Sequence, residues 1–441
     1  MTRRALAIEI VRELRERGHQ AFLVGGCVRD RLLGITPKDY DVSTDAVPQN
    51  VLSYFAQSQP VGAHFGVILV GSSSGAHVEV ATFRSEGAYA DGRRPEEVRF
   101  ETNPRLDVLR RDFTVNGLME DPTTGEILDY CGGQTDLRAG IIRAIGDPRR
   151  RFAEDHLRML RAVRFAARFH FAIEPETMRA IRDLAPAIHR ISAERIRDEL
   201  VRILTEGDAR RGLELLDESG LLAEILPEVK AYQGVPQPPE FHPEGDVWTH
   251  TLMMLEKLKR PTVTLAFGIL LHDVGKPPTF RVAGRIRFDG HAEVGSEMAA
   301  RILSRLKFPN DECDQIVSLV ANHMRFKDVM QMRASTLKRF LRLPDFGEHL
   351  ELHRLDTQAS NGYTAAYDFV REQLEHLGKE ELRPPRLITG RDLIEAGYHP
   401  GPPFSKALEA VETAQLEGEI STKDQALALA RGVLENKGEG L

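Results

Sequence analysis

The chain has 441 residues, of which 41% are hydrophobic and 28% are charged, and its net charge is −7. These values are ordinary for a globular protein of two to four domains. The three cysteines lie far apart without metal-ligand spacing, which argues against a disulfide framework. The most apolar stretch, residues 263–271, is too short to span a membrane.

The first 18 residues predict a charged amphipathic helix, because Leu6, Ile10 and Leu14 recur at helical spacing. This segment lacks the apolar core of a signal peptide. Together with the cysteine usage, it leads us to expect a cytoplasmic protein with no membrane partner.

The next elements are expected to be a strand, a short helix and a second strand, at residues 21–24, 28–33 and 39–43. Gly25 and Gly26 lie in the first turn, where the absence of a Cβ lets the backbone approach a ligand. Asp39 and Asp41 would project from one face of the second strand. Close carboxylates repel each other unless a cation lies between them, and oxygen ligands favour Mg²⁺ together with a phosphate.

The pattern continues as an α+β domain to about residue 145. The expected elements are a helix at 48–57, a hairpin of strands 67–71 and 77–83, a mobile Gly/Arg-rich loop at 84–101, and short strands at 127–129 and 141–144. Hairpin geometry could place Glu79 beside the Asp pair, although an exposed strand glutamate would look the same.

After residue 146 helical patterns dominate. A helix is predicted over 152–169, and residues 141–170 contain arginines at 143, 149, 150, 151, 158, 161, 164 and 168. Such a patch is typical of phosphate binding, although a solvated helix face is the plain alternative. Residues 231–245, rich in Pro and Gly, are expected to be a linker, and helices carrying scattered histidines follow it.

The ordered set Gly25-Gly26-Cys27-Val28-Arg29-Asp30, Asp39-x-Asp41, Glu79, Arg110-Arg111-Asp112 and Glu154-Asp155-x-x-Arg158 is far more specific than any single piece. It resembles the class II tRNA nucleotidyltransferase and bacterial poly(A) polymerase family, within the polymerase-β-like nucleotidyltransferases. The resemblance covers about residues 20–230 and is strongest to the CCA-adding enzymes, which rebuild the 3′ end of tRNA without a nucleic-acid template.

The resemblance implies a two-metal mechanism in which Asp39 and Asp41 hold two Mg²⁺ ions and Glu79 is the third catalytic carboxylate. It also implies nucleotide contacts for a larger set. These are Gly26 and Arg29 at the triphosphate, Arg111 and Asp112 beside the sugar and phosphates, and Asp155, Arg158, Arg161 and Arg164 at the base and beyond.

Asp155 and Arg158 are three residues apart and are expected to share one face of the predicted helix. An aspartate accepts hydrogen bonds and an arginine donates them. Cytosine and adenine each present an amino donor beside a ring-nitrogen acceptor, whereas guanine and uracil present a protonated ring nitrogen and a carbonyl. One Asp/Arg pair can therefore accept C and A and reject G and U.

The resemblance leaves the products open. The 84–110 region is about as long as the flexible loop of full CCA-adding and A-adding enzymes, which counts against CC-only addition. Addition of A alone and poly(A) synthesis stay open as alternatives.

A second pattern, His250, His272-Asp273 and Asp356, resembles the HD phosphohydrolase superfamily, with His291 and His323 as its optional extra histidines. Imidazole and carboxylate ligands suit a divalent transition metal or Mg²⁺. A metal here would generate a hydroxide to attack a phosphoester.

We therefore expect an α+β polymerase-β-like nucleotidyltransferase head at 1–145, an all-α neck and body at 146–235, an HD domain at 236–365, and a helical tail at 366–441. The expected function is addition of CMP and AMP from CTP and ATP to the tRNA 3′ end, with phosphohydrolase activity in the HD domain. A metal phosphohydrolase with an RNA-binding head is the rival from another class. The oligomeric state is not readable.

Overall fold

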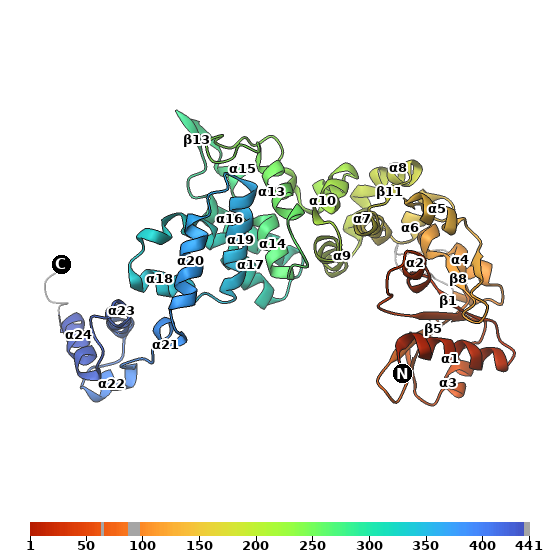
Figure 1. Ribbon diagram of the computed structural model, residues 1–441, viewed down its shortest axis with the longest axis horizontal. Helices are drawn as coiled ribbons and strands as arrows, with labels where there is room; N and C mark the ends of the chain where they lie inside the picture. The colour runs from red at the N-terminus through yellow and green to blue at the C-terminus, as the bar shows by residue number, and fades with distance from the viewer. Residues whose placement is uncertain (63–65, 87–97, 436–441) are drawn as a thin grey trace. The chain divides into compact units, whose positions relative to one another are not determined.

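The computed structural model of the chain describes residues 1–62, 66–86 and 98–435 (Figure 1). Its internal contacts divide the chain into two units. The first unit is Met1–Ala231 with the short segments Leu258–Val263 and Ser304–Phe308, and the second is Tyr232–Lys257, Thr264–Leu303 and Pro309–Leu441. No helix within the described ranges is both long and apolar enough for a membrane crossing.

A seven-stranded mixed sheet in the order β3-β4-β5-β2-β1-β8-β9 is the centre of the first unit. Its strands are β1 (Ala21–Val24), β2 (Asp41–Thr44), β3 (Ser58–Gly62), β4 (Val67–Gly71), β5 (His77–Thr82), β8 (Leu118–Glu120) and β9 (Ile127–Asp129). β2 and β5 run parallel, and the other neighbours are antiparallel. The predicted hairpin at 67–83 is confirmed, but the predicted strand at 39–43 begins two residues later than expected.

Helices of the head pack on this sheet. They are α1 (Arg3–Glu16), α2 (Gly26–Leu32), α3 (Pro48–Tyr54), α4 (Pro104–Leu109), the 3₁₀ turn η2 (Thr114–Asn116) and α5 (Gly133–Ala139). The predicted amphipathic face of α1 is confirmed, because Leu6, Ile10 and Leu14 are buried. The expected loop at 84–101 begins and ends in the paired strands β6 (Arg84–Glu86) and β7 (Val98–Phe100), and residues 87–97 lie outside the described ranges.

Helices dominate the rest of the first unit. They are α6 (Pro148–Glu154), α7 (Leu157–Phe169), α8 (Pro175–Leu184), η3 (Ala185–Arg190), α9 (Ala193–Thr205), α10 (Ala209–Glu218), α11 (Leu221–Ile225) and α12 (Pro227–Lys230). The parallel pair β10 (Ile141–Ile142) and β11 (Ala172–Ile173) joins them to the head. The single helix predicted over 152–169 is wrong, because the chain is extended at Asp155 and α7 starts afresh.

The second unit is helical apart from one hairpin. Its elements are α13 (Val247–Glu256), α14 (Val263–Leu271), α15 (Lys276–Thr279), β12 (Arg281–Ala283), β13 (Arg285–Arg287), α16 (His291–Arg305), α17 (Asn310–Asn322), η4 (His323–Gln331), α18 (Ala334–Leu341), α19 (Phe346–Ala359), α20 (Ala365–His376), α21 (Lys379–Leu382), α22 (Gly390–Glu395), α23 (Pro402–Glu417) and α24 (Lys423–Glu435). The hairpin β12–β13 was not predicted from the sequence.

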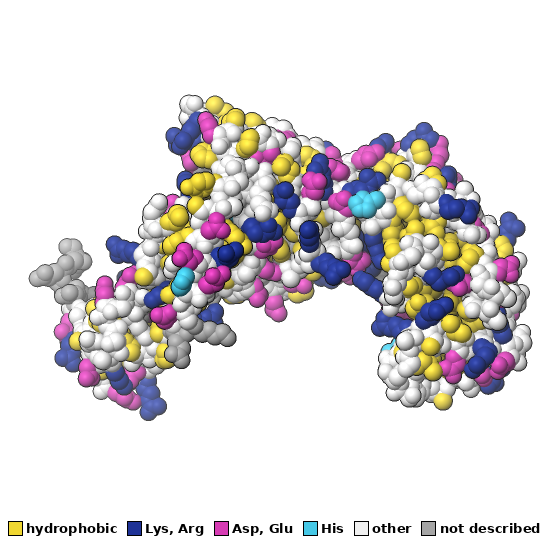
Figure 2. Space-filling view, in the orientation of Figure 1, with side chains coloured by type: hydrophobic (Ala, Val, Ile, Leu, Met, Phe, Trp, Pro, Cys, Tyr) yellow, Lys and Arg dark blue, Asp and Glu magenta, His cyan; other side chains and the backbone are white. Residues whose placement is uncertain are grey.

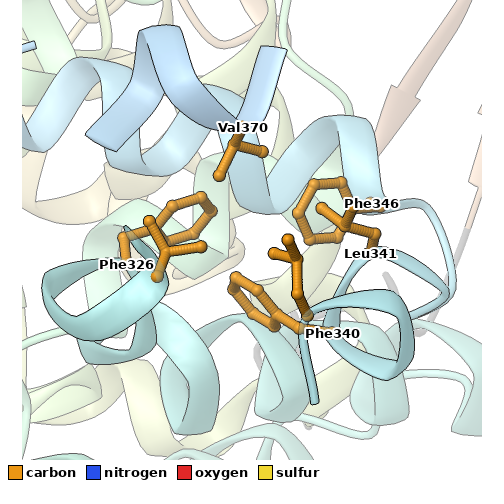
Figure 3. Close-up of a cluster of buried hydrophobic side chains, with 7 residues drawn as sticks. Phe326, Phe340, Leu341, Phe346 and Val370 are labelled. Carbon is orange, nitrogen blue, oxygen red and sulfur yellow. The ribbon is translucent and has the colours of Figure 1, made fainter. Parts of the chain in front are cut away.

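A hydrophobic cluster holds η4, α18, α19 and α20 together (Figure 3). The side chains that point toward one another there include Phe326, Phe340, Leu341, Phe346 and Val370. His353 of α19 stacks on the ring of Phe326 with 4.2 Å between centroids, so it is part of this packing. The cluster fixes α19, which carries Asp356.

Candidate active site and a second cluster of metal-ligand side chains

The strand register brings two of the predicted carboxylates together. Asp41 of β2 is the direct partner of Glu79 of β5 in a parallel pair, so both side chains project from the same face of the sheet. Asp39 lies before the strand, 75% exposed, and its Oδ1 accepts a hydrogen bond of 2.6 Å from Nη1 of Arg3. It is nonetheless close enough to act electrostatically on Asp41.

The local charge around Asp41 fits a cation. Burial raises the pKa of the Asp41 carboxyl to about 6, and the carboxylates of Glu79 and Asp39 act in the same direction, whereas Arg111 opposes them. An ionised Asp41 is therefore undercompensated by the protein itself. Mg²⁺ prefers oxygen ligands, and a bound cation would offset the repulsion between these carboxylates. Asp39, Asp41 and Glu79 therefore fit the Mg²⁺ ions that the resemblance implies.

The glycine turn lies against an arginine. Gly25 has φ +73°, a conformation that favours glycine, and a Cβ there would come within 3.2 Å of Nη1 of Arg111. Gly26 opens α2, in which the Arg29 side chain is buried. Arg29 donates to Oδ1 of Asp30 (2.8 Å) and to Oδ1 of Asn116 (2.5 Å), so its guanidinium is held in one orientation.

Arg111 and Asp112 are both held by ion pairs. Nη2 of Arg111 donates to Oδ2 of Asp107 at 2.9 Å, and Oδ2 of Asp112 accepts from Nη2 of Arg161 at 2.6 Å. Burial alone would raise the pKa of the Asp112 carboxyl, but Arg161 and Asn116 hold it well below the usual range. Asp112 is therefore an ionised anchor for Arg161.

The proposed base-reading pair does not share a helix face as expected. Asp155 is extended (φ −147°, ψ 105°) between α6 and α7, and Arg158 lies in the first turn of α7. Oδ1 of Asp155 accepts from the Leu157 amide (3.0 Å), and Oδ2 accepts from Nη2 of Arg195 (2.9 Å). Nη1 of Arg158 donates to Oε2 of Glu154 at 2.8 Å. Both side chains still reach the same cavity.

The arginine stripe of α7 faces inward. Nε of Arg164 lies 2.8 Å from Oε2 of Glu199, and both side chains are buried. Burial lowers the pKa of Arg164 to about 10, and Arg161 and Arg202 act in the same direction while Glu199 opposes them. The alternative of a solvated helix face is therefore wrong for Arg161 and Arg164.

A cavity of about 480 Å³ joins these residues. Its lining is Gly25, Gly26, Arg29, Asp41, Arg110, Arg111, Asp112, Asn116, Asp155, Leu157, Arg158, Arg161, Arg164, Phe165, Arg168 and Arg195. Eight of these side chains are arginines and three are aspartates, an excess of positive charge that suits a polyphosphate. Asp39 and Glu79 are not part of the lining.

Six lining residues were not predicted from the sequence, namely Arg110, Asn116, Leu157, Phe165, Arg168 and Arg195. Arg110 belongs to a quoted motif, Asn116 follows that motif by four residues, and Arg168 belongs to the arginine stripe, so a signal existed for them. The sequence contains no signal for Arg195, because nothing near it in the chain indicates that it forms an ion pair with Asp155.

A second cluster lies in the second unit. His250 is on α13, His272 and Asp273 follow α14, and Asp356 is on α19. Nε2 of His250 lies 3.2 Å from Oδ1 of Asp356, and Nε2 of His272 lies 3.1 Å from Oδ2 of Asp273. The four residues of the predicted HD pattern are thus brought together.

The optional histidines join the same cluster through Asp273. Its Oδ1 lies 3.7 Å from Nε2 of His291 and 3.8 Å from Nε2 of His323, while its Oδ2 lies 2.7 Å from Nζ of Lys276. Two of the three groups with metal-ligand spacing in the described residues, His250–His272–Asp273 and Asp273–His291–His323, share Asp273, and the third is His242–Glu244–His250.

The other ring nitrogen of each histidine is already used. Nδ1 of His272, His291 and His323 lies 2.7–2.8 Å from a backbone carbonyl three residues earlier, and that of His250 lies 2.6 Å from Oε1 of Glu244. At His272, His291 and His323 a donating Nδ1–H leaves the Nε2 lone pair toward the cluster, which is the state a metal ligand needs. Burial would lower the pKa of His250, but its hydrogen bonds to Asp356 and Glu244 raise it to about 9, so a metal must displace a proton from this ring. Burial also lowers the pKa of His323 to about 3, so it is neutral near pH 7.

Glu244 was missed because its segment was predicted to be a linker. Its Oε1 lies 2.9 Å from Nδ1 of His242 and 2.6 Å from Nδ1 of His250. From the same segment, Oε1 of Gln237 accepts from Nζ of Lys276 at 2.6 Å. The Pro/Gly-rich stretch therefore forms one wall of the cluster.

Comparison with known proteins finds three matching family models. They are "Poly A polymerase head domain" over residues 21–143, "Probable RNA and SrmB- binding site of polymerase A" over 170–233, and "tRNA nucleotidyltransferase domain 2" over 291–430.

Among curated proteins, the chain is 38% identical to the multifunctional CCA protein of Neisseria gonorrhoeae over 74% of this chain and 79% of that protein. It is 36% identical to the multifunctional CCA protein of Halorhodospira halophila over 88% and 94%. Among solved structures, the CCA-adding enzyme of Bacillus stearothermophilus in complex with CTP has a TM-score of 0.74, 27% identity and 98% coverage of both chains. That of Thermotoga maritima complexed with tRNA, at 19% identity and TM-score 0.59, shares the fold, covering 98% of this chain and 95% of its own.

Proposed function

The chain belongs to the family of multifunctional CCA proteins, and from this premise we propose that it adds CMP and AMP from CTP and ATP to the 3′ end of tRNA. One observation carries the proposal. Asp41, which lies beside Glu79 on the same face of the sheet, lines a basic cavity that Asp155 and Arg158 also line. The proposed binding sites for a metal, a triphosphate and a base are therefore adjacent to one another.

The residues of the head fall into a metal-binding group and a triphosphate-binding group. Asp39, Asp41 and Glu79 would hold divalent ions, for which we propose Mg²⁺. Bound there, the ions would favour the deprotonated RNA 3′-hydroxyl and neutralise charge on the triphosphate. Gly26 lets the backbone approach the phosphates, and Arg29 donates to them from its fixed position.

Base choice belongs to Asp155 and Arg158. Arg195 and the Leu157 amide fix the carboxylate of Asp155, which keeps further lone pairs for the amino group of cytosine or adenine. Arg158 donates to the ring nitrogen. Guanine and uracil would place a carbonyl oxygen against the acceptor Asp155 and an N–H against the donor Arg158. Neither contact can form a hydrogen bond, so buried polar groups would stay unpaired. Arg111, Asp112, Arg161 and Arg164 shape the rest of the nucleotide site.

The test offers tRNA transcripts that end before CCA, after C and after CC, with CTP, ATP or both. With both nucleotides present, we expect each transcript to be completed to CCA and no further. Addition of A only to the transcript ending in CC would identify an A-adding enzyme, and long A tracts would identify a poly(A) polymerase. Absence of any incorporation, together with hydrolysis of phosphoesters, would favour a hydrolase with an RNA-binding head.

A second activity is favoured by the histidine cluster of the second unit. His250, His272, Asp273 and Asp356 form a ligand set for a divalent metal, and His291 and His323 extend it. The preset Nε2 lone pairs of His272, His291 and His323 carry this proposal, with Mn²⁺, Ni²⁺, Fe²⁺, Zn²⁺ or Mg²⁺ as the candidates. A metal bound there would supply an activated water for phosphoester hydrolysis. Metal analysis of the purified protein, followed by hydrolysis assays with each added metal, tests it.

With tRNA as its substrate, the protein is expected in the cytoplasm. Fractionation of cells that express the tagged chain checks this expectation.

A further inference from the structure

The hairpin β12–β13 is rich in arginine and lies in the sequence between two residues of the second cluster, Asp273 and His291. It follows Lys276 by a few residues and ends just before His291. Figure 1 shows it extending away from the helices of its unit, and Figure 2 shows Lys and Arg side chains at that edge. No role in the nucleotidyl transfer described above involves it.

The strand register sorts its side chains by charge. Arg281 pairs with Arg287 and Ala283 pairs with Arg285, so the three arginines share one face, while Val282 and Ile286 lie on the other. Like charges directly opposite each other in a sheet are destabilising. Asp289 pairs with Arg281, which leaves the face with a clear excess of positive charge. A bound anion would relieve this repulsion.

Two aromatic rings connect the base of the hairpin to the cluster. Phe280 and Phe288 stand at the base of the hairpin with 5.9 Å between ring centroids. The Phe288 ring is 5.5 Å from Nζ of Lys276 and 6.4 Å from the His291 ring, and its backbone carbonyl accepts from Nδ1 of His291 at 2.8 Å. Phe280 remains 37% exposed. The base of the hairpin therefore lies beside the side chains of the second cluster.

We propose that this hairpin docks a single-stranded RNA end, with its phosphates on Arg281, Arg285 and Arg287 and a base against Phe280. A basic track with an exposed aromatic ring is the usual way to hold single-stranded nucleic acid. The inference rests on the proposed hydrolase function and names its substrate class, a phosphoester at the end of an RNA strand rather than a free mononucleotide.

The first test is photo-crosslinking of the full chain with an eight-nucleotide RNA that carries 4-thiouridine near its 3′ end. We expect crosslinked peptides from residues 276–291, lost several-fold in the double variant Arg281→Gln/Arg285→Gln. The matched control is Arg371→Gln/Arg391→Gln, which removes the same charge from exposed positions of α20 and α22 in the same unit. Absence of crosslinks in this peptide, or equal loss in the control, overturns the proposal.

The second test separates the two possible phosphoester sources. With the metal that gives the highest activity, the hairpin variant should lose about tenfold or more in kcat/KM for an RNA bearing a terminal phosphoester, and little for the matching mononucleotide. The apparent affinity for the RNA should also depend less on salt, by a slope of about 0.7 for each phosphate contact removed. An equal loss for both substrates would place the arginines in a general phosphate site and overturn the choice of RNA.

Outcomes for the two proposals remain distinct. Crosslinking at the hairpin without hydrolysis of any phosphoester would retain the docking site and remove the hydrolase function. Unchanged CCA addition by the variant verifies that the chain is folded and that the head is unaffected.

Discussion

The head and the second unit hold their acidic groups in opposite ways. In the head, Asp39 and Glu79 are exposed, and Asp41 borders an open cavity rich in arginine. In the second unit, Asp273 and its neighbouring histidines are buried, and each histidine is oriented by a hydrogen bond from its other nitrogen. The first arrangement suits ions that arrive and leave with a nucleotide, and the second suits a resident ion. The two centres should therefore respond differently to mutation, chelators and pH.

The largest expected effect is at Asp41. We expect Asp41→Ala to lower CMP and AMP incorporation on the order of 10³-fold or more, because several kcal/mol of charge stabilisation disappear. Primer extension with radiolabelled CTP measures it. Glu126→Ala, an exposed carboxylate of the same unit, is the control. Retained tRNA extension by Asp41→Ala would show that the catalytic assignment is wrong.

Removal of Asp273 should break the second centre and spare the first. We expect Asp273→Ala to abolish stable metal binding at this centre, since two of the three ligand groups share this carboxylate. It also leaves the buried ammonium of Lys276 without its negatively charged partner, a loss of about 3–5 kcal/mol in the free energy of unfolding of that unit. Elemental analysis and thermal unfolding measure both, with the exposed Asp314→Ala as control. Full metal content in Asp273→Ala would contradict the ligand assignment.

A smaller effect is expected one step away from the metal. Glu244→Gln weakens the hydrogen bond to Nδ1 of His250 without emptying the site, so metal affinity should fall roughly 10–100-fold. Chelator competition measures this change, and Glu293→Gln, exposed on α16, serves for comparison. If the two variants bind metal equally well, Glu244 does not orient His250.

The smallest effect concerns pH. Because burial and neighbouring carboxylates raise the pKa of Asp41 to about 6, protons compete with the ion as pH falls through that value. The Mg²⁺ concentration for half-maximal tRNA extension should therefore rise several-fold between pH 7 and pH 5.5. In the metal-free protein the raised pKa has a second consequence, which concerns the free energy of unfolding. This free energy should fall as pH rises from about 4 to about 6, because Asp41 ionises over that range and its charge destabilises the fold. Asp41→Asn should then raise Tm at pH 7 by a few degrees.

The sequence was informative where the signal is local. Helical spacing identified α1, the glycine pair identified the turn before α2, and alternation identified the β4–β5 hairpin. The side-by-side placement of Asp41 and Glu79 depends on a parallel register between strands that are not consecutive, which no local pattern specifies.

Errors arose where distant partners decide the structure. Asp155 leaves the helix because Arg195 of α9 and the Leu157 amide hold its carboxylate. Arg161 and Arg164 were predicted at the nucleotide site, but the sequence did not show that Asp112 and Glu199 would be the partners that hold them. Glu244 was missed because Pro and Gly composition indicates flexibility but says nothing of a hydrogen bond to His250.

The strand order of the head bears on how the chain folds as it is synthesised. β1 lies between β2 and β8, so its second edge stays open until residues 118–120 have left the ribosome. Unpaired edges invite association with other chains, and pairings distant in sequence close slowly. A nascent chain that stalls before β8 therefore exposes β1, and we expect truncations that end before residue 118 to aggregate even though they contain both Asp41 and Glu79.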